Sequence, residues 1–279
     1  MKQQEISSKS VINSYHRVIE VFKNEKNAIY SRFGDGDVEI MMGNDQQNHH
    51  FSEELSAELK EAFSIADENY LKGLAVNYPI EKGMSYGLFL PFTKNQVMEE
   101  YLKNNFSIPE NYEYESAVFF HYLAVFKPKM IKALLDEIIR PKKKMFIGNI
   151  PNESIEKLIG KVDYHIETPF KDAYSTIDEW WPEVEKNLQN VDMVIPAAGM
   201  ASRAINKRIW NLNVNVQSFD IGSVVDAVDS RKSRKWIKLL GHRIDKILIP
   251  KMTLKDSVNY LAKDAFFYLR RSFKKLKGQ

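Results

Sequence analysis

The sequence contains no cysteine, and this absence excludes two kinds of site. Without cysteine the chain forms neither a disulfide framework nor a cysteine-ligated zinc centre. Long hydrophobic runs are also missing, because no stretch approaches the roughly 20 apolar residues that cross a bilayer. The first residues contain no apolar core, so we expect no signal peptide. These absences together predict a cytoplasmic protein that at most rests on a membrane surface.

An excess of charge of one sign is missing as well. Lysine and arginine number 40 against 37 aspartates and glutamates, which gives a net charge of +3. Proteins that bind nucleic acid usually carry a concentrated basic face, so we expect no nucleic-acid partner. Hydrophobic residues make up 44% of the chain and charged residues 28%, as in an ordinary globular protein. A length of 279 residues suits one large α/β domain.

Segments with helical periodicity alternate with short β-rich runs along the chain. We expect helices at 11–22, from 52 onward, and at 97–102, 131–139, 177–188 and 201–210, with a last helix from 254 onward. The expected strands are 28–33, 74–76, 144–148, 164–166, 191–195, 214–221 and 244–249, while 116–126 fits either state. This alternation predicts an α/β fold whose mostly parallel sheet carries helices on both faces. Ligands of such sheets bind at the carboxyl ends of the strands.

The segment Arg32–Glu39 follows the first long strand and concentrates charge in a glycine-containing loop. Asp35 and Asp37 are two positions apart, so in an extended or turning chain both could reach one ion. Mg²⁺ and Mn²⁺ prefer carboxylate oxygens and bridge to phosphate oxygens, and Arg32 could offset diphosphate charge. An acidic turn explains the same residues without a ligand. An EF-hand fits less well, because its twelfth position would be Gln46, and a haloacid-dehalogenase-type phosphatase motif lacks its flanking residues.

Four blocks of the sequence resemble one family in the expected order. Residues 32–37, Arg-Phe-Gly-Asp-Gly-Asp, resemble the Arg-Phe-Gly-Asp-Gly-Glu signature of the GT-D-type glycosyltransferases. Residues 169–174, 195–201 and 219–222 resemble that family's Pro-x-x-Asn/Asp-Ala, strand-Gly-x-Ala and Asp-Ile-Gly segments. The resemblance spans roughly residues 28–225. The resemblance departs at Asp37, where the family usually has glutamate. The aspartate side chain is one methylene shorter, and Glu39 could compensate as a metal ligand.

The resemblance implies a bacterial Rossmann-like enzyme that transfers sugars from nucleotide donors with an Asp-X-Glu metal motif. It implies a manganese or magnesium site, with Asp35, Asp37 and Glu39 as the candidate ligands. The candidate catalytic residues are Asp35, Asp37 and Asp220. Asp220 ends an expected strand and is the candidate general base for the acceptor hydroxyl, while a turn or helix-capping aspartate explains it without a ligand. The candidate donor-binding residues are Arg32, Phe33, Gly34, Gly36, Lys171, Asp172, Tyr174, Gly199 and Ser202.

The turn that contains Gly199 also suits an anion by its local chemistry. Its small residues permit close approach, and the following helix offers backbone N–H groups at its N-terminus. A plain strand-to-helix turn explains the same residues, and the lack of Gly-x-Gly-x-x-Gly argues against an NAD site.

The expected function is transfer of a sugar, with UDP as the expected nucleotide, to a glycan or lipid-linked acceptor. The implied pathway is the assembly of surface polysaccharide or glycoprotein glycans. Two alternatives stay open: a nucleotide-sugar hydrolase or similar metal-dependent phosphate-ester enzyme, and a non-catalytic subunit that binds nucleotide or glycan. Nucleotide release that does not depend on an added acceptor would indicate the first alternative instead of a transferase.

The C-terminal residues 254–279 form a separate feature after the expected glycosyltransferase domain at 1–253. Apolar residues recur there at near-helical spacing and are accompanied by lysines and arginines. A basic amphipathic helix of this kind can lie on anionic lipid, here at the inner membrane face. A solvated helix that packs one face on the domain is the alternative.

Overall fold

The computed structural model describes residues 6–46, 49–76, 79, 95–110 and 112–229, together with 237, 240, 243–248, 254, 255, 258, 261, 262 and 265. Within these residues eight strands form one sheet in the order β1-β4-β3-β2-β8-β7-β5-β6, and every pair is parallel. The strands are β1 Ser7–Ser8, β2 Ile29–Phe33, β3 Tyr70–Leu74, β4 Glu113–Ser116, β5 Lys144–Gly148, β6 Tyr164–Ile166, β7 Met193–Ala197 and β8 Gln217–Phe219. The predicted α/β class is therefore confirmed.

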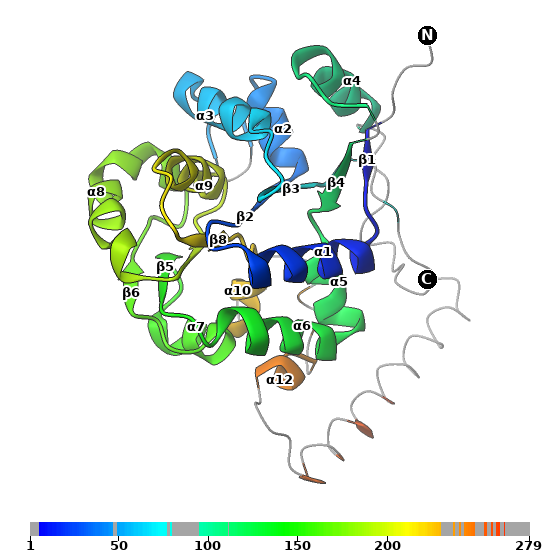
Figure 1. Cartoon of the computed structure of the whole chain (residues 1–279), viewed down its shortest axis with the longest axis vertical. Helices are drawn as coiled ribbons and strands as arrows, with labels where there is room; N and C mark the ends of the chain where they lie inside the picture. The colour runs from blue at the N-terminus through cyan, green and yellow to red at the C-terminus, as the bar shows by residue number, and fades with distance from the viewer. Residues whose placement is uncertain are drawn as a thin grey trace.

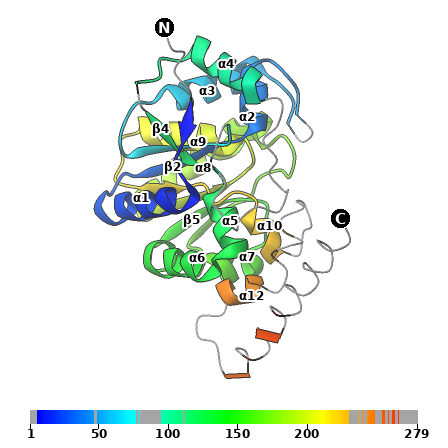
Figure 2. The same ribbon diagram turned by 90° about the vertical axis from the view of Figure 1, so that its right-hand side faces the viewer.

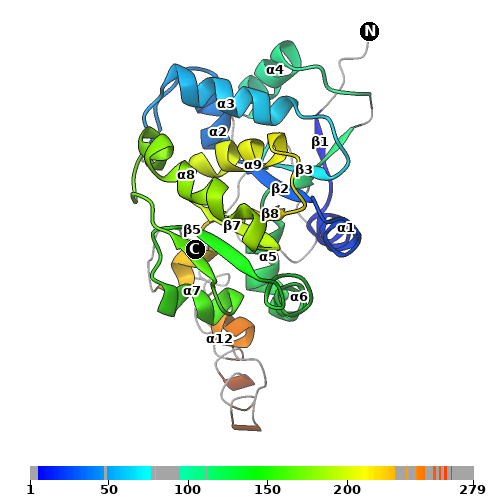
Figure 3. The same ribbon diagram turned by 60° about the vertical axis from the view of Figure 1, so that its left-hand side comes forward.

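Helices cover both faces of this sheet. They are α1 Val11–Asn24, α2 Asp35–Met41, α3 Glu53–Ser64, α4 Asn95–Asn105, α5 Phe119–Phe126, α6 Pro128–Leu134, α7 Asn152–Ile159, α8 Ile177–Asn187, α9 Ala201–Asn211, α10 Val224–Val228 and α12 Arg243–Leu248. A π-helical turn, η1 Leu135–Ile139, extends α6, and two 3₁₀ turns, η2 Ala173–Thr176 and η3 Leu188–Asn190, flank α8. Figure 1 places α2, α3, α8 and α9 on one side of the sheet and α1, α5, α6 and α7 on the other. Figures 2 and 3 show the same two layers from other directions.

The two layers follow from the alternation of side chains along each strand. In β2, Ile29 faces the core beneath α8 and α9, and Tyr30 faces the core beneath α1 and α5. In β5, Met145 and Ile147 belong to the first of these cores and Phe146 to the second. A third cluster buries Phe33 and the apolar faces of α2, α3 and α4. Strands buried on both faces need apolar residues at successive positions, which explains their continuous apolar runs.

The order of the strands reverses beside β2. From β2 the chain moves through β3 to β4, and then returns from the opposite side through β5, β6 and β7 to β8. β2 and β8 are therefore neighbours whose following loops run in different directions. Ligands of open α/β sheets bind at the carboxyl end of such a reversal.

Two predicted strands were placed wrongly. Residues 244–249 were expected to be a strand, but α12 is a helix in which Ile244, Ile247 and Leu248 pack on the core with helical spacing. The Ile247 carbonyl accepts an N–H of Arg140 at 2.9 Å, so a long-range contact helps to fix this helix. The strand expected at 74–76 is instead β3, which begins at Tyr70.

The break in the apolar pattern of β3 is Lys72, a lysine that is buried. Its ammonium donates to the Phe63 carbonyl at 2.8 Å and lies over the Phe63, Tyr112 and Tyr114 rings. The ambiguous segment 116–126 resolves into the end of β4 followed by α5.

Only part of the expected C-terminal helix falls within the described residues. Residues 254, 255, 258, 261, 262 and 265 are helical. Residues 266–279, with the remaining apolar and basic positions of that prediction, lie outside the described residues. The division of the chain after residue 253 therefore stays a prediction.

Candidate active site at the carboxyl edge of the sheet

The loops after three neighbouring strands meet at one place on the carboxyl edge. β2 pairs with β8 and β8 pairs with β7, all in parallel, so their ends lie together. Arg32 lies near the end of β2, Asp220 directly follows β8, and Gly199 follows β7. The Asp220 N–H donates to the Tyr30 carbonyl at 3.0 Å, which fixes the start of the β8 loop beside β2. This position is the reversal of strand order described above.

Asp37 joins this edge from helix α2. Gly34 is the N-cap of α2, and the Asp37 oxygen Oδ2 accepts the Gly34 N–H at 2.7 Å, as in one half of a capping box. The side chain is buried, with Asp37 only 3% exposed. The expected glycine-containing loop is therefore a helix start, because the Asp37 carboxylate satisfies a backbone donor there.

Arg203 connects the two carboxylates, although the sequence reasoning gave it no role. It lies in the first turn of α9. Its Nη2 is 2.9 Å from Asp37 Oδ2, its Nη1 is 3.3 Å from Asp220 Oδ2, and Nη1 also donates to the Gly199 carbonyl at 2.7 Å. A cation at a helix N-terminus is opposed by the helix dipole, so a buried arginine there needs carboxylate partners. That signal could have singled out Arg203.

Arg32 is the second cation of the cluster. Its Nε donates to the Ala117 carbonyl at 2.7 Å, and its Nη1 is 3.8 Å from Asp220 Oδ1. Gly222 makes room for it: a Cβ on Gly222 would lie 1.5 Å from Arg32 Nη1, and its φ of +62° also favours glycine. The Gly222 N–H donates to Asp220 Oδ1 at 2.9 Å. This glycine therefore holds both the arginine and the aspartate in place.

The four side chains of Arg32, Asp37, Arg203 and Asp220 are referred to below as the charge cluster. Two carboxylates alternate with two guanidinium groups, so the cluster is neutral when all four are ionised. Burial raises the pKa of Asp37 from 3.8 to about 6, while Arg203 and the Gly34 N–H oppose this shift. Asp37 thus changes its charge near neutral pH, which makes the cluster sensitive to pH.

The family model of the glycosyltransferase GT-D fold matches residues 30–239, a range that includes the whole charge cluster. The chain belongs to the GT-D-fold glycosyltransferases. It is therefore an enzyme of sugar transfer, and the predicted family is confirmed.

Solved structures support the fold of this glycosyltransferase. A glycosyltransferase (DUF1792) from Streptococcus sanguinis superimposes with a TM-score of 0.63 at 19% identity, covering 90% of this chain and 96% of that one. Two structures of domain of unknown function 1792, one of them described as having a distinct glycosyltransferase fold, give TM-scores of 0.64 and 0.63 at 16% identity. Each covers 90% of this chain and 92% of its own. No curated protein matches the chain.

The three expected metal ligands of the glycosyltransferase do not lie together. Asp35 and Asp37 are two positions apart on a helix and so point in nearly opposite directions. Asp35 is exposed and accepts the Gly36 N–H at 3.0 Å, and Glu39 accepts the Asn44 amide at 2.8 Å. Among the described residues no group of three or more histidine, aspartate and glutamate side chains is placed to hold a metal ion.

Asp37 is the expected ligand that fits a cation best. Its Oδ1 is buried and has no hydrogen-bond partner among the described residues. A buried carboxylate oxygen without a donor is suited to a cation. Mg²⁺ is commonly held by one or two carboxylates together with substrate phosphates and water, so a complete protein cage is not required.

The turn after β7 is shaped by Gly199. Its φ is +61°, and a Cβ there would lie 2.5 Å from the His49 ring, so the histidine packs directly on the glycine. The Ser202 hydroxyl accepts the Ala198 N–H at 3.1 Å and thereby stabilises the turn before α9. Gly199 is positioned at the charge cluster, because its carbonyl accepts from Arg203, whereas Ser202 contacts the turn itself.

The three expected donor-binding residues after β6 do not point to one place. Lys171 is exposed and has no ion pair among the described residues. Asp172 adopts a positive φ of 47°, and its Oδ1 accepts the His50 N–H at 2.8 Å, which ties this loop to residues 49–51. The Tyr174 hydroxyl donates to Glu58 of α3 at 3.2 Å, so its ring points toward α3. The structure thus brings Asp172 to the carboxyl edge and directs Tyr174 away from it.

The remaining residues of the first loop have structural contacts. Phe33 is fully buried, and its ring packs edge-on against Phe63 at 5.1 Å, which leaves only its backbone for a donor. Gly34 caps α2, as described above. A Cβ on Gly36 would lie 2.9 Å from the end of the Met200 side chain, so Gly36 provides close packing of the first loop on the β7 turn.

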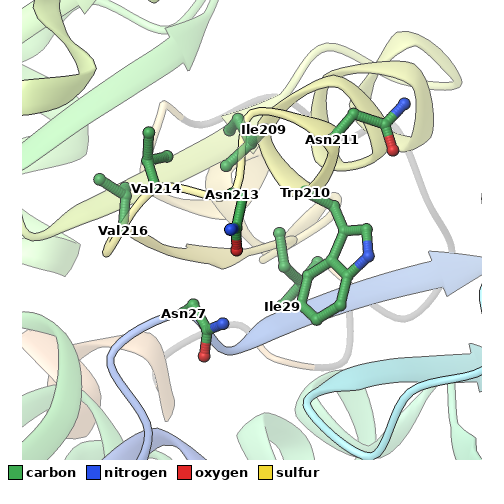
Figure 4. Close-up of a pocket in the computed structure, with 8 residues that line it drawn as sticks. All are labelled: Asn27, Ile29, Ile209, Trp210, Asn211, Asn213, Val214 and Val216. Carbon is green, nitrogen blue, oxygen red and sulfur yellow. The ribbon is translucent and has the colours of Figure 1, made fainter.

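A cavity of about 300 Å³ lies at the opposite, amino edge of the same strands. Its lining is apolar or amide in character: Asn27, Ile29, Ile209, Trp210, Asn211, Asn213, Val214 and Val216. Figure 4 shows the Trp210 ring beside Ile29 at the beginning of β2. The cavity is therefore remote along the strands from the charge cluster and shares none of its charged groups.

Proposed function

We propose that this glycosyltransferase takes a nucleotide-sugar donor, with UDP as the nucleotide, and binds its diphosphate at the charge cluster. The observation that carries the proposal is the alternation of Asp37, Arg203, Asp220 and Arg32 at the reversal of strand order. Guanidinium groups suit phosphate oxygens, and a buried cluster at a strand reversal is a usual ligand position in an α/β sheet.

A manganese or magnesium ion is the cofactor we propose. Asp37 would hold it through Oδ1, the buried oxygen without a hydrogen-bond partner among the described residues. Asp35 and Glu39 would join only by turning from their present contacts with Gly36 and Asn44. The chemistry that such an ion supplies when bound is neutralisation of charge on the leaving diphosphate.

In the proposed reaction an acceptor hydroxyl oxygen bonds to the anomeric carbon of the sugar. The bond from that carbon to the diphosphate oxygen breaks, and the nucleoside diphosphate leaves with the bonding electrons. Asp220 is the proposed acceptor of the hydroxyl proton, since its Oδ2 faces the cluster and, apart from the ion pair with Arg203, accepts no hydrogen bond among the described residues. Arg32 and Arg203 supply positive charge beside the leaving group.

The acceptor side is proposed to lie along the two loops joined by Asp172 and His50. Phe170 and Phe51, one on each loop, are exposed at 60% and 37%. Aromatic faces near a sugar site provide apolar contact area with a polar surrounding, which suits a glycan. We propose a glycan or lipid-linked acceptor in surface polysaccharide or glycoprotein glycan assembly, and a cytoplasmic enzyme. Within the described part of the chain, no helix is both long enough and apolar enough to cross a bilayer.

The proposal is tested by a screen of nucleotide sugars with Mn²⁺, in which sugar transfer and nucleotide release are measured separately. Asp37→Asn should lower transfer by roughly 100-fold or more, since it removes the proposed ligand. Asp178→Asn, at an exposed aspartate on α8, is the control and should retain activity. Asp35→Asn reports whether the exposed carboxylate contributes.

Full transfer by Asp37→Asn would contradict the proposed site. Nucleotide release that ignores added acceptor would instead favour a nucleotide-sugar hydrolase.

A further inference from the structure

The helical residues that follow α12 carry an exposed apolar stripe. Leu254, Val258 and Leu261 are spaced four and three positions apart, so they share one face of a helix. Their exposed fractions are 84%, 58% and 65%. Other exposed aliphatic residues in the described part of the chain, Val97 and Leu212, lie singly on separate segments. Scattered apolar residues are normal on a surface, but an aligned group of three indicates an interaction face.

The net positive charge of the protein comes from the sequence of the same segment. Residues 254–279 contain seven lysines and arginines against two aspartates, a net charge of +5. The whole chain carries +3, so the first 253 residues carry −2. The excess of positive charge therefore belongs to the segment whose sequence contains the apolar stripe, and the rest of the chain has a small net negative charge.

We propose that this face docks on an anionic lipid surface. The aliphatic stripe enters the boundary between headgroups and acyl chains, and the basic residues of the same segment are attracted to negative headgroups. This inference is independent of the proposed donor chemistry, since none of its residues belongs to the charge cluster. It would place the glycosyltransferase at a membrane, where a lipid-linked acceptor is presented.

The charge distribution favours lipid over a second copy of the chain. Two copies that met through this face would bring two segments of charge +5 together, and their repulsion opposes such a dimer. An anionic membrane has the opposite sign, so burial of the stripe and electrostatic attraction act in the same direction.

The test is co-sedimentation of the full chain with vesicles of phosphatidylcholine, with and without about 30% phosphatidylglycerol. We expect at least about tenfold stronger binding to the anionic vesicles and loss of most binding at about 0.5 M salt. Val258→Glu should weaken binding by about tenfold or more. Val97→Glu is a matched control, because Val97 is also an exposed valine on a helix, at 55%; its binding should stay within about twofold of the wild type.

Leu261→Glu tests the same helix face independently and should weaken vesicle binding as much as Val258→Glu does. Equal binding to neutral and anionic vesicles would overturn the proposal, as would equal effects of Val258→Glu and Val97→Glu. Absence of vesicle binding together with a dimer that Val258→Glu dissociates in light scattering would overturn it in favour of self-association. Sugar transfer to a water-soluble acceptor is unaffected by any of these outcomes, so this test and that of the donor site fail separately.

Discussion

The two ends of the same central elements differ in chemistry. β2 begins with Ile29 at the amino-edge cavity and has Arg32 near its carboxyl end. α9 has Arg203 in its first turn and Trp210 near its last residue, beside the cavity. Charged groups gather at the carboxyl edge, and the cavity at the amino edge is lined by apolar and amide side chains.

The chemistry of the two edges, more than their concave shape, favours the carboxyl edge as the proposed active site of this enzyme. The cavity has a volume of about 300 Å³, yet its lining offers no group for acid–base chemistry or phosphate charge. The carboxyl edge offers two guanidinium groups, two carboxylates and the first turn of α9. Parallel strands produce this asymmetry, because their carboxyl ends lead toward helix N-termini, whereas their amino ends follow helix C-termini.

The largest expected difference between the two edges is in sugar transfer. Asp37→Asn should lower kcat/KM by roughly 100- to 1000-fold, because the cluster loses a negative charge and its proposed cation ligand. Asn211→Ala at the amino-edge cavity should leave kcat/KM within about twofold. Steady-state kinetics on both purified variants measures the difference. Comparable losses at both edges would remove the distinction between them.

A smaller loss of activity is expected when the charge cluster keeps its net charge but loses the contacts of a planar guanidinium group. Arg203→Lys should lower kcat/KM by roughly 10- to 100-fold, because an ammonium group cannot contact Asp37 and Asp220 as a planar guanidinium does. Arg208→Lys is the control on the same helix, since Arg208 pairs with Glu58 and Asp178 away from the cluster. If the two lysine variants were equally active, Arg203 would have no special role.

Two glycine-to-alanine variants separate the effect of backbone strain from the effect of displacing Arg32. Gly222→Ala and Gly43→Ala each place alanine at positive φ, and this backbone strain alone should cost each about 1 kcal/mol of stability in thermal unfolding. Only Gly222→Ala also pushes Arg32 aside, because nothing lies within 4 Å of a Cβ at Gly43. We therefore expect about tenfold lower transfer for Gly222→Ala alone. Equal losses of transfer activity in Gly222→Ala and Gly43→Ala would attribute the loss to backbone strain.

The pH dependence should have opposite signs for activity and for stability. The pKa of Asp37 is about 6 in the folded chain against an ordinary 3.8. Activity that needs the ionised carboxylate should therefore fall about tenfold per pH unit below about 6. The folded state binds the proton more tightly, so the stability from this group is full below 3.8 and is lost as pH rises through 6.

The stability change is on the order of 3 kcal/mol, and chemical denaturation at pH 4 and pH 7 in wild type and Asp37→Asn isolates it. An activity profile without a limb near pH 6 would argue against an ionised Asp37 in the reaction.

Much of the fold could be predicted because its signals are local. The apolar runs of β5 and β7 and the periodic face of α9 depend on neighbours in sequence, and these elements were predicted close to their observed bounds. α12 could not be predicted, because Ile247-Leu248-Ile249 reads as a strand until its packing is known. Strand β3 was predicted too late in the sequence, because the charged Lys72 interrupts the apolar run at its centre. Only the surrounding aromatic rings explain a buried lysine.

The candidate site was predicted in outline and missed in detail for a similar reason. The sequence places the two aspartates of Gly34-Asp35-Gly36-Asp37 in equivalent settings, and only the helix start separates an exposed Asp35 from a buried Asp37. Arg203 is distant in sequence from both carboxylates that it contacts, so its role depends on the assembled sheet.

Titration of UDP by calorimetry, with and without Mn²⁺, tests most directly whether the charge cluster is the donor site. For the wild type we expect that Mn²⁺ strengthens UDP binding, and that Asp37→Asn removes most of this gain while Asn211→Ala keeps it. The same Mn²⁺-dependent gain in wild type and Asp37→Asn, or UDP binding indifferent to Mn²⁺ in the wild type, would contradict it.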